Sequence, residues 1–201
     1  TGTGSQAAAD KRGDSISNKV TVNGSAAVSG TVYGGYTGVM GGKATGNTVT
    51  ITGGSMGDVY GGFTGGTGAT TGNVINLGTE TDAFAATSVG TLWGGNGSNV
   101  TGNTLNVYAK NAVLHSVKNF DKYVFHLKGD AASAAPMLTL KATDGFGALV
   151  DWNKLSLDTA NAANTQAIGK ATLLKSETAN ALKFKNYAAK SQTSGDYETT
   201  L

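Results

Sequence analysis

The chain has 201 residues, a formal net charge of +2, 31 glycines, one proline and no cysteine. The absence of cysteine excludes a disulfide scaffold, a thiolate metal site and a cysteine nucleophile. The weak net charge excludes the strong basic field of a typical nucleic-acid-binding protein. Abundant glycine with little proline and recurring β-branched residues indicates an all-β fold with many turns.

Residues 1–17 form a polar lead-in to the first repeat. They include Arg12, Gly13 and Asp14, a sequence that resembles the integrin-binding tripeptide and marks these three residues as a candidate contact; matches of this length also arise by chance. No apolar run approaches the ~20 residues of a membrane helix, and no charged-then-apolar leader opens the chain. We interpret the sequence as an excised or processed piece.

Two short units alternate between residues 18 and 110. The first is Asn-x-apolar-x-apolar, which recurs about every 26 to 30 residues, at 18–22, 47–51, 73–77 and 103–107. Strict alternation predicts a strand with one buried face, and stacking such strands from successive coils builds a continuous core. Two inward apolar ladders are expected, one of Val20, Val49, Ile75 and Leu105 and one of Val22, Ile51, Leu77 and Val107. Asn18, Asn47, Asn73 and Asn103 are expected to stack as an amide ladder.

The second unit is Gly-x-apolar-aromatic-Gly-Gly, at residues 30–35, 57–62 and 90–95. The Gly-Gly pairs predict a sharp turn that needs positive φ or a close backbone approach. The aromatic residues should align near one corner, either as packing beneath the turn or as a ligand-contacting stripe, a sugar being one candidate ligand. The candidate ligand-binding residues are Tyr33, Tyr36, Tyr60, Phe63 and Trp93. The inserts Thr64–Thr71 and Thr79–Thr87 are expected to project as loops and are better candidates for partner contact.

The repeat fails after residue 110. Because an open solenoid end exposes strand edges, we interpret 111–152 as a β-rich capping module and 153–201 as its C-terminal extension. Strands are predicted within 112–117, 119–127, 137–140 and 148–152, with a further strand in 170–175 and room for a short helix in the tail.

The sequence shows no group of residues that matches a known catalytic arrangement. His115 and His126 lie near no nucleophile-elbow motif, and His126 is expected to face solvent, since it alternates with Phe125 and Leu127. In the repeats Asp58, Glu80 and Asp82 do not recur on one face; Glu80 and Asp82 could reach the spacing of paired catalytic carboxylates, but a solvated loop is favoured. We therefore expect no enzyme activity, no metal site and no cofactor.

The alternation of the two units resembles the passenger repeats of Gram-negative autotransporters; the segments that carry the resemblance are 32–35, 59–62 and 92–95, which alternate with 46–51 and 102–107. The segment 119–127 is similar to the region before the membrane barrel of these proteins. The resemblance implies a right-handed parallel β-helix displayed on the cell surface by type V secretion. It further implies adhesion or aggregation through a host or bacterial surface protein or glycan, with self-association also possible. No nucleic-acid partner is expected, and membrane contact only through a barrel that this chain does not include. The alternatives are a β-helix carbohydrate-active enzyme and a purely structural spacer.

Overall fold

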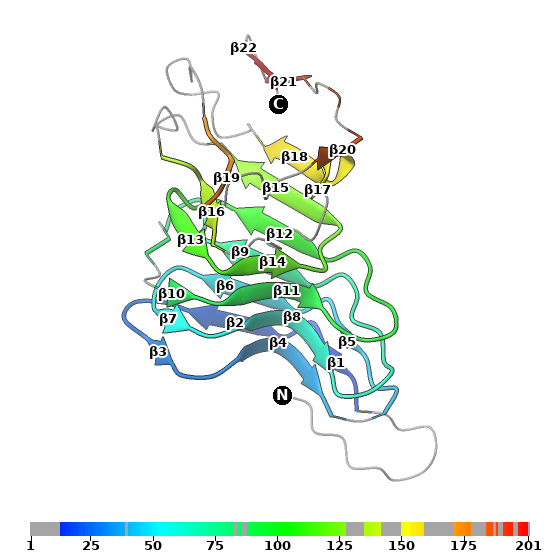
Figure 1. Ribbon diagram of the computed structural model, residues 1–201. Helices are drawn as coiled ribbons and strands as arrows, with labels where there is room; N and C mark the ends of the chain where they lie inside the picture. Colours follow the sequence, from blue (N-terminus) through cyan, green and yellow to red (C-terminus); the bar gives the residue numbers. More distant parts are fainter. Residues whose placement is uncertain are drawn as a thin grey trace.

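A computed structural model describes residues 13–38, 40–82, 84–85, 88–127, 135–141, 150–158, 171–177, 184–186, 188, 191–194 and 197–200. These residues form β-strands and one short 3-10 helix, and the strands of successive coils stack in parallel along one axis (Figure 1). The predicted all-β parallel solenoid is confirmed. Within the described ranges no helix is long and apolar enough to cross a membrane.

The largest sheet, here called the six-stranded sheet, is built from the Asn-x-apolar-x-apolar units and their C-terminal successors. All of its neighbouring strands pair in parallel. In chain order, which is also their order in space, its strands are β2 (Lys19–Val22), β6 (Thr48–Ile51), β9 (Val74–Leu77), β12 (Thr104–Val107), β15 (Lys122–His126) and β18 (Leu155–Asp158).

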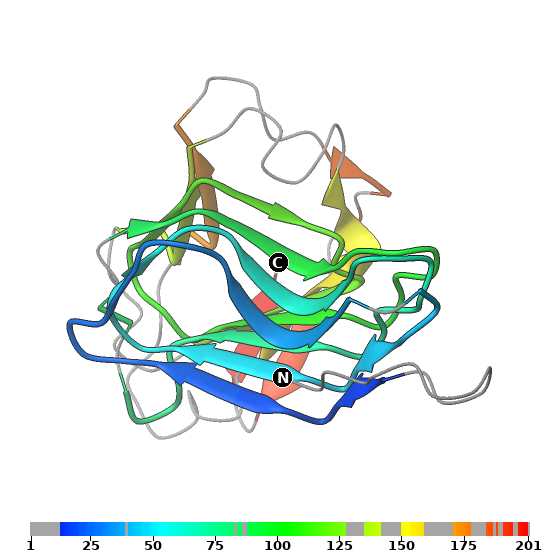
Figure 2. The same cartoon turned by 90° about the horizontal axis from the view of Figure 1, so that it is seen from below.

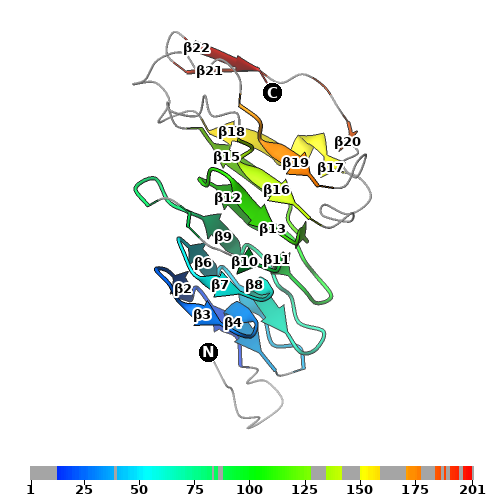
Figure 3. The ribbon, with the colours of Figure 1, turned by 60° about the vertical axis from the view of Figure 1, so that its left-hand side comes forward.

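A four-stranded sheet forms a second face of the solenoid, as the view along the stack shows (Figure 2). Its strands are β4 (Val32–Thr37), β8 (Val59–Thr64), β11 (Thr91–Gly95) and β14 (Ser116–Lys118). Short parallel strands line the remaining edges (Figure 3): β1 (Ser15–Ile16) with β5 (Ala44–Thr45), then β3 (Ala27–Val28), β7 (Ser55–Met56) and β10 (Ser88–Val89), and finally β13 (Ala112–Leu114), β16 (Leu138–Leu140) and β19 (Leu174–Ser176).

The core includes the pair of apolar ladders inside the six-stranded sheet, together with buried residues of the other sheets such as Val59, Leu92 and Leu138. Val49 pairs with Ile75, which in turn pairs with Leu105, and all three are fully buried. Ile51, Leu77 and Val107 repeat this pattern two residues further along each strand. Both predicted ladders are confirmed, with Val20 and Val22 as their N-terminal rungs.

The C-terminal elements continue the stack beyond the repeats. β15 pairs in register with β12, so the six-stranded sheet passes through the predicted boundary at residue 110 without interruption; the division into repeats and cap stays a prediction. Residues 112–117 form two strands, β13 and β14, which are separated by His115. The remaining elements are β17 (Val150–Asp151), β20 (Phe184–Lys185), β21 (Ser191–Ser194) and β22 (Tyr197–Thr200), of which β21 and β22 pair antiparallel.

The strand predicted at 148–152 is shorter than expected. Ala148 and Leu149 lie outside the described residues, and Trp152 begins the 3-10 helix η1 (Trp152–Lys154). Asp151 ends the strand because its side chain accepts a hydrogen bond from the Asn153 backbone N–H, which caps the helix. Within 170–175 the described strand is β19, which begins at Leu174; the short helix considered for the tail falls partly outside the described residues, and those that are described form no α-helix.

The Gly-Gly pairs lie inside strands, so the prediction of a turn with positive φ is wrong. Gly34 and Gly61 belong to β4 and β8, and neither has a positive φ. The alternative, a close approach, is confirmed: a Cβ on Gly34 would lie 2.5 Å from the Gly61 carbonyl oxygen and 2.8 Å from Val49 Cγ2. A Cβ on Gly35 would meet the Asn47 side chain. The two glycines therefore make room for the core and the amide ladder.

The insert Thr64–Thr71 also differs from its prediction as a projecting loop. Ala69 bridges Asn99 of the next coil, and Thr70 is fully buried. The Ala44 N–H donates to the Ala69 carbonyl at 2.9 Å, so this segment stacks between the coils on either side. In the insert Thr79–Thr87, residues 79–82 form an exposed turn held by hydrogen bonds between Thr79 and Asp82.

Candidate functional site: an outer aromatic ladder

The four-stranded sheet brings all five predicted aromatic residues together. Pairing of β4, β8 and β11 places Tyr33 opposite Tyr60 and Tyr60 opposite Trp93. The ring centroids of these two pairs are 5.6 and 5.5 Å apart, with stacked planes. A second column begins three residues along the strands, where Tyr36 stacks on Phe63 at 5.5 Å and 2° between planes. We call these five side chains the aromatic ladder.

The two columns also contact each other edge to face. Tyr33 lies 5.2 Å from Tyr36 and 5.1 Å from Phe63, and Tyr60 lies 5.1 Å from Phe63, all in T-shaped arrangements. The pair of glycines between the columns explains this arrangement: both face the interior, so the residues before and after them share the outer side of the sheet. Each such contact adds about 0.5–1.5 kcal/mol beyond area burial.

Polar groups close the C-terminal end of the first column. Lys118 of β14 pairs with Trp93 and holds its Nζ 5.1 Å from the indole centroid, which is a cation–π distance. Asp58 accepts a hydrogen bond from the Thr91 backbone N–H at 2.9 Å and a longer one from Trp93 Nε1 at 3.4 Å. Burial, followed by the charge of Asp58, raises the pKa of the Tyr60 hydroxyl.

The aromatic ladder is half open to solvent. Tyr33, Tyr60, Phe63 and Trp93 are half-buried, and Tyr36 is 36% exposed. Because neighbouring rings cover most of one another's faces, the ladder offers mainly ring edges and tyrosine hydroxyls. It packs along the outside of strands and not beneath a turn, and its role in ligand binding stays a prediction.

Inside the sheets, the predicted amide ladder is present. The backbone N–H and Nδ2 of Asn18, Asn47 and Asn73 each donate to Oδ1 of the next asparagine at 2.9–3.0 Å. Asn47, Asn73 and Asn103 are fully buried, and their Nδ2 groups also donate to backbone carbonyls. The hydrogen bonds from one asparagine to the next all point toward the following coil, whereas those from Nδ2 to backbone carbonyls point toward the preceding coil.

The tripeptide at 12–14 is only partly described, because Arg12 lies outside the described residues. The Gly13 carbonyl accepts a hydrogen bond from Thr37 Oγ1 at 2.8 Å, and Asp14 Oδ1 accepts one from the Lys43 backbone N–H at 2.8 Å. One carboxylate oxygen of Asp14 is thus engaged in holding the first coil, although the residue is exposed. Its integrin-type role stays a prediction.

A second cluster, around His126, was missed in the sequence. The prediction that His126 faces solvent is wrong, because its side chain is only 12% exposed. Its Nδ1 lies 2.8 Å from Asp158 Oδ2, its Nε2 lies 3.3 Å from Asn106 Oδ1, and its ring stacks 3.8 Å from that of Tyr108. Burial lowers the pKa of His126, against an opposing effect of Asp158. The register of β15 with β18 brings together His126 and Asp158, which are 32 residues apart in the sequence. No local sequence motif predicts this contact.

Neither cluster assembles a recognisable catalytic or metal centre. Among the described residues, no three His, Asp or Glu side chains gather to hold a metal ion. His126 faces a carboxylate and an amide oxygen and has no hydroxyl nucleophile among its hydrogen-bond partners. Glu80 and Asp82 sit together in an exposed turn, as expected of a solvated loop.

Comparison with known proteins found no matching family model, curated protein or solved structure.

Proposed function

We propose that this chain is a non-enzymatic adhesive segment displayed on the surface of a Gram-negative cell, in which the solenoid is a stiff support and the aromatic ladder contacts the partner. The aromatic ladder is the observation that carries the proposal. Five aromatic side chains lie in register on the outside of one sheet, where the interior does not require them. Exposed aromatic clusters are typical of binding surfaces.

Support for surface display comes from the resemblance of the repeats to autotransporter passengers and from the parallel stack that this resemblance implies. The partner class in this proposal is a host or bacterial surface protein or a glycan. Tyrosine hydroxyls and ring edges suit both classes, since each hydroxyl can donate and accept a hydrogen bond beside an apolar surface.

The test is a binding screen of the chain against an array of glycans and a panel of host surface proteins. A double variant, Tyr60→Leu with Phe63→Leu, should lose at least about tenfold in affinity for any ligand found, because it removes the central ring of the first column and one of the two rings of the second. Tyr108→Leu is the matched control, since Tyr108 directly follows β12 of the other sheet. Both variants need the far-ultraviolet circular dichroism of the parent before their affinities are compared.

Two results would contradict this function. If the chain binds nothing in the screen and does not aggregate cells, the spacer alternative takes its place. Cleavage of a polysaccharide panel by the purified chain would instead establish the enzyme alternative.

A further inference from the structure

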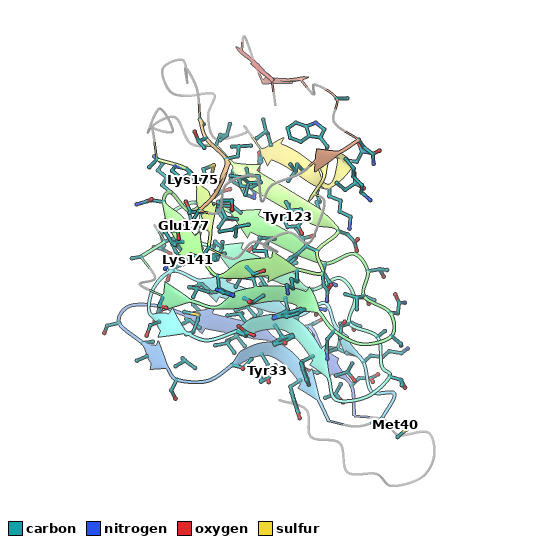
Figure 4. All side chains as sticks on the ribbon, in the orientation of Figure 1. Tyr33, Met40, Tyr123, Lys141, Lys175 and Glu177 are labelled. Carbon is teal, nitrogen blue, oxygen red and sulfur yellow. The ribbon has the colours of Figure 1, made fainter. Side chains whose placement is uncertain are left out.

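Polar side chains form a continuous row across the outer side of the six-stranded sheet. In β15, Tyr123 and Phe125 are buried inside the stack, and His126 follows on the outer side; Figure 4 labels Tyr123. Each of five neighbouring strands contributes one side chain to the row, and these are Thr50, Asn76, Asn106, His126 and Asp158. We call these five side chains the outer polar row.

Four hydrogen bonds join the members of the outer polar row. Asn76 Nδ2 donates to Thr50 Oγ1 at 3.2 Å, and Asn106 Nδ2 donates to Asn76 Oδ1 at 2.8 Å. Asn106 Oδ1 lies 3.3 Å from His126 Nε2, and His126 Nδ1 lies 2.8 Å from Asp158 Oδ2. Because the amide oxygen and the carboxylate oxygen are both acceptors, these directions require a proton on each ring nitrogen. The arrangement is therefore the one that a protonated His126 needs.

The backbone does not fix the direction of the outer polar row. In the amide ladder, Asn73 Oδ1 also accepts from the Asn47 backbone N–H, and Asn73 Nδ2 also donates to the Ala44 carbonyl. That amide consequently has a single satisfactory orientation. Within the described part of the chain, the side-chain amides of Asn76 and Asn106 hydrogen-bond only to other members of the outer polar row. Turning both amides over exchanges donors for acceptors without losing a hydrogen bond.

A neutral His126 favours the opposite direction. Its Nδ1 keeps the single proton and donates to Asp158, so its Nε2 becomes an acceptor that faces Asn106. Asn106 then turns to donate from Nδ2, which directs its Oδ1 toward Asn76 and turns that amide in the same way. The Thr50 hydroxyl, which can donate as well as accept, ends the row by donating to Asn76 Oδ1. The three hydrogen bonds between Thr50 and His126 are all kept, with their directions reversed.

The surroundings of His126 hold the ring in place and oppose its charge. Tyr108 stacks on the imidazole with 3.8 Å between ring centroids and 11° between planes. The charged groups around the ring are Asp158 of β18, Glu80 of the exposed turn and Lys122 of β15 itself. Burial, the largest effect, lowers the pKa of His126 and Lys122 adds to it, whereas Asp158 and Glu80 favour the imidazolium. The neutral ring is therefore the form at neutral pH, and acid is needed to protonate it.

We propose that the outer polar row is a two-state hydrogen-bond switch whose direction is set by the proton on His126. With a neutral ring the donors point from Thr50 toward His126, and with a protonated ring they point from His126 toward Thr50. Protonation at β15 thereby changes the hydrogen bonding at β6, three strands away. The outer side of this sheet then presents a different pattern of donors and acceptors at acid and at neutral pH. The inference does not depend on the adhesive role of the aromatic ladder, which lies on the other sheet.

An NMR titration of the isotope-labelled full chain tests the switch. At pH 7.5 the imidazole nitrogen shifts should place the proton of His126 on Nδ1, and the exposed His115 is the reference for a ring outside the row. The pH is then lowered until His126 is protonated. The side-chain NH₂ signals of Asn76 should shift with the same midpoint as His126, although Asn106 lies between the two residues. The signals of Asn73, whose amide orientation is fixed, should stay unchanged.

Two variants separate the switch from the electric field of the imidazolium. Asn106→Leu removes the middle of the row, so His126 should still titrate while the Asn76 signals lose their response. Thr104→Val is the matched control, because Thr104 lies on the same outer side of β12 and has no place in the row; the Asn76 response should survive it. Both variants need the far-ultraviolet circular dichroism of the parent. If Asn106→Leu does not fold, the titration of the parent still decides the question.

Three results would overturn the proposal. One is a neutral His126 that carries its proton on Nε2, since the row would then keep one direction at every pH. Another is an Asn76 amide that does not follow His126, which includes a ring that stays neutral until the chain unfolds. The third is an Asn76 response that persists in folded Asn106→Leu, because the charge would then act through space and not through the hydrogen bonds.

Discussion

At the scale of single residues, asparagine serves two different purposes in neighbouring positions. Asn73 faces inward and is fully buried within the amide ladder, while Asn76 faces outward and donates to Thr50 Oγ1 at 3.2 Å. The same side chain is thus structurally required at one position and replaceable three residues later, because burial determines what an unmade hydrogen bond costs.

Substituting Asn73 by alanine should destabilise the fold by at least about 3 kcal/mol, whereas Asn76→Ala should cost less than about 1 kcal/mol. The first change removes the Oδ1 that accepts from the Asn47 backbone N–H and Nδ2, and the Nδ2 that donates to Asn103 Oδ1 and to the Ala44 carbonyl. Urea titration of the two variants gives the free energy of unfolding and so measures both losses in stability. Equal losses would show that the buried ladder contributes no more than a surface amide.

The requirement for glycine within the strands can be tested by a similar pair of substitutions. A Cβ on Gly62 would lie 2.6 Å from Asn73 Nδ2 and 2.7 Å from the Ala44 carbonyl oxygen, while a Cβ on Gly30 would meet nothing within 4 Å. Gly62→Ala should therefore cost at least about 2 kcal/mol through overpacking. Gly30→Ala should be neutral or stabilising by up to about 1 kcal/mol, because alanine restricts the unfolded chain. Thermal melts of the two variants test both expectations. A Gly62→Ala variant that melts at the same temperature as the parent would refute the close backbone approach at Gly62.

At the scale of the elements, the strands could be predicted from the periodicity of apolar residues along the sequence. Alternation in 47–51 or 73–77 identifies both the strand and its buried face, and the recurrence of the units identifies the partner strands. The Gly-Gly pairs were misinterpreted because two small residues in sequence look alike whether φ is positive or a neighbouring chain is close. Tyr33, Tyr60 and Trp93 could be placed in one row because they recur in phase with the coils.

The His126 cluster could not be predicted in this way. Its members lie in β15, in β18 and in or directly after β12, and only the register of strands far apart in sequence aligns them. Nothing in the segment 119–127 specifies Asp158 as a partner.

The free energy of unfolding is expected to depend on pH through this cluster, which links three elements. Burial lowers the pKa of His126 below its unfolded value of about 6.5, so the unfolded chain binds the proton more readily and stability should fall as the pH drops below about 6.5. The charged groups around His126 are Asp158, Glu80 and Lys122; the first two oppose this shift and Lys122 adds to it.

Urea unfolding at pH 7.5, 6.5 and 5.5 measures the effect, and His126→Gln should flatten the profile. A parent protein that becomes more stable at pH 5.5 than at pH 7.5, by an amount the variant lacks, would show that Asp158 outweighs burial and that the protonated pair holds β18 to β15.

At the scale of the whole molecule, the fold is a one-dimensional stack in which each coil contacts only its neighbours. Stability is then approximately a sum of coil and interface terms, and the same side chain should be worth more in the interior than at an end. Val20 and Val49 allow a matched comparison, since they are consecutive rungs of one ladder. Val49 is fully buried between two coils, whereas Val20 is half-buried and, among the described residues, has a neighbouring strand of its sheet on one side only.

Val49→Ala should therefore cost about 2 kcal/mol, through lost burial and an unfilled cavity, and Val20→Ala less than about 1 kcal/mol. Native-state hydrogen exchange adds the spatial detail: Val20→Ala should speed exchange in β2 alone, while Val49→Ala should speed it in β2, β6 and β9 together. Equal costs for the two variants would mean that the first coil is as well covered as the second.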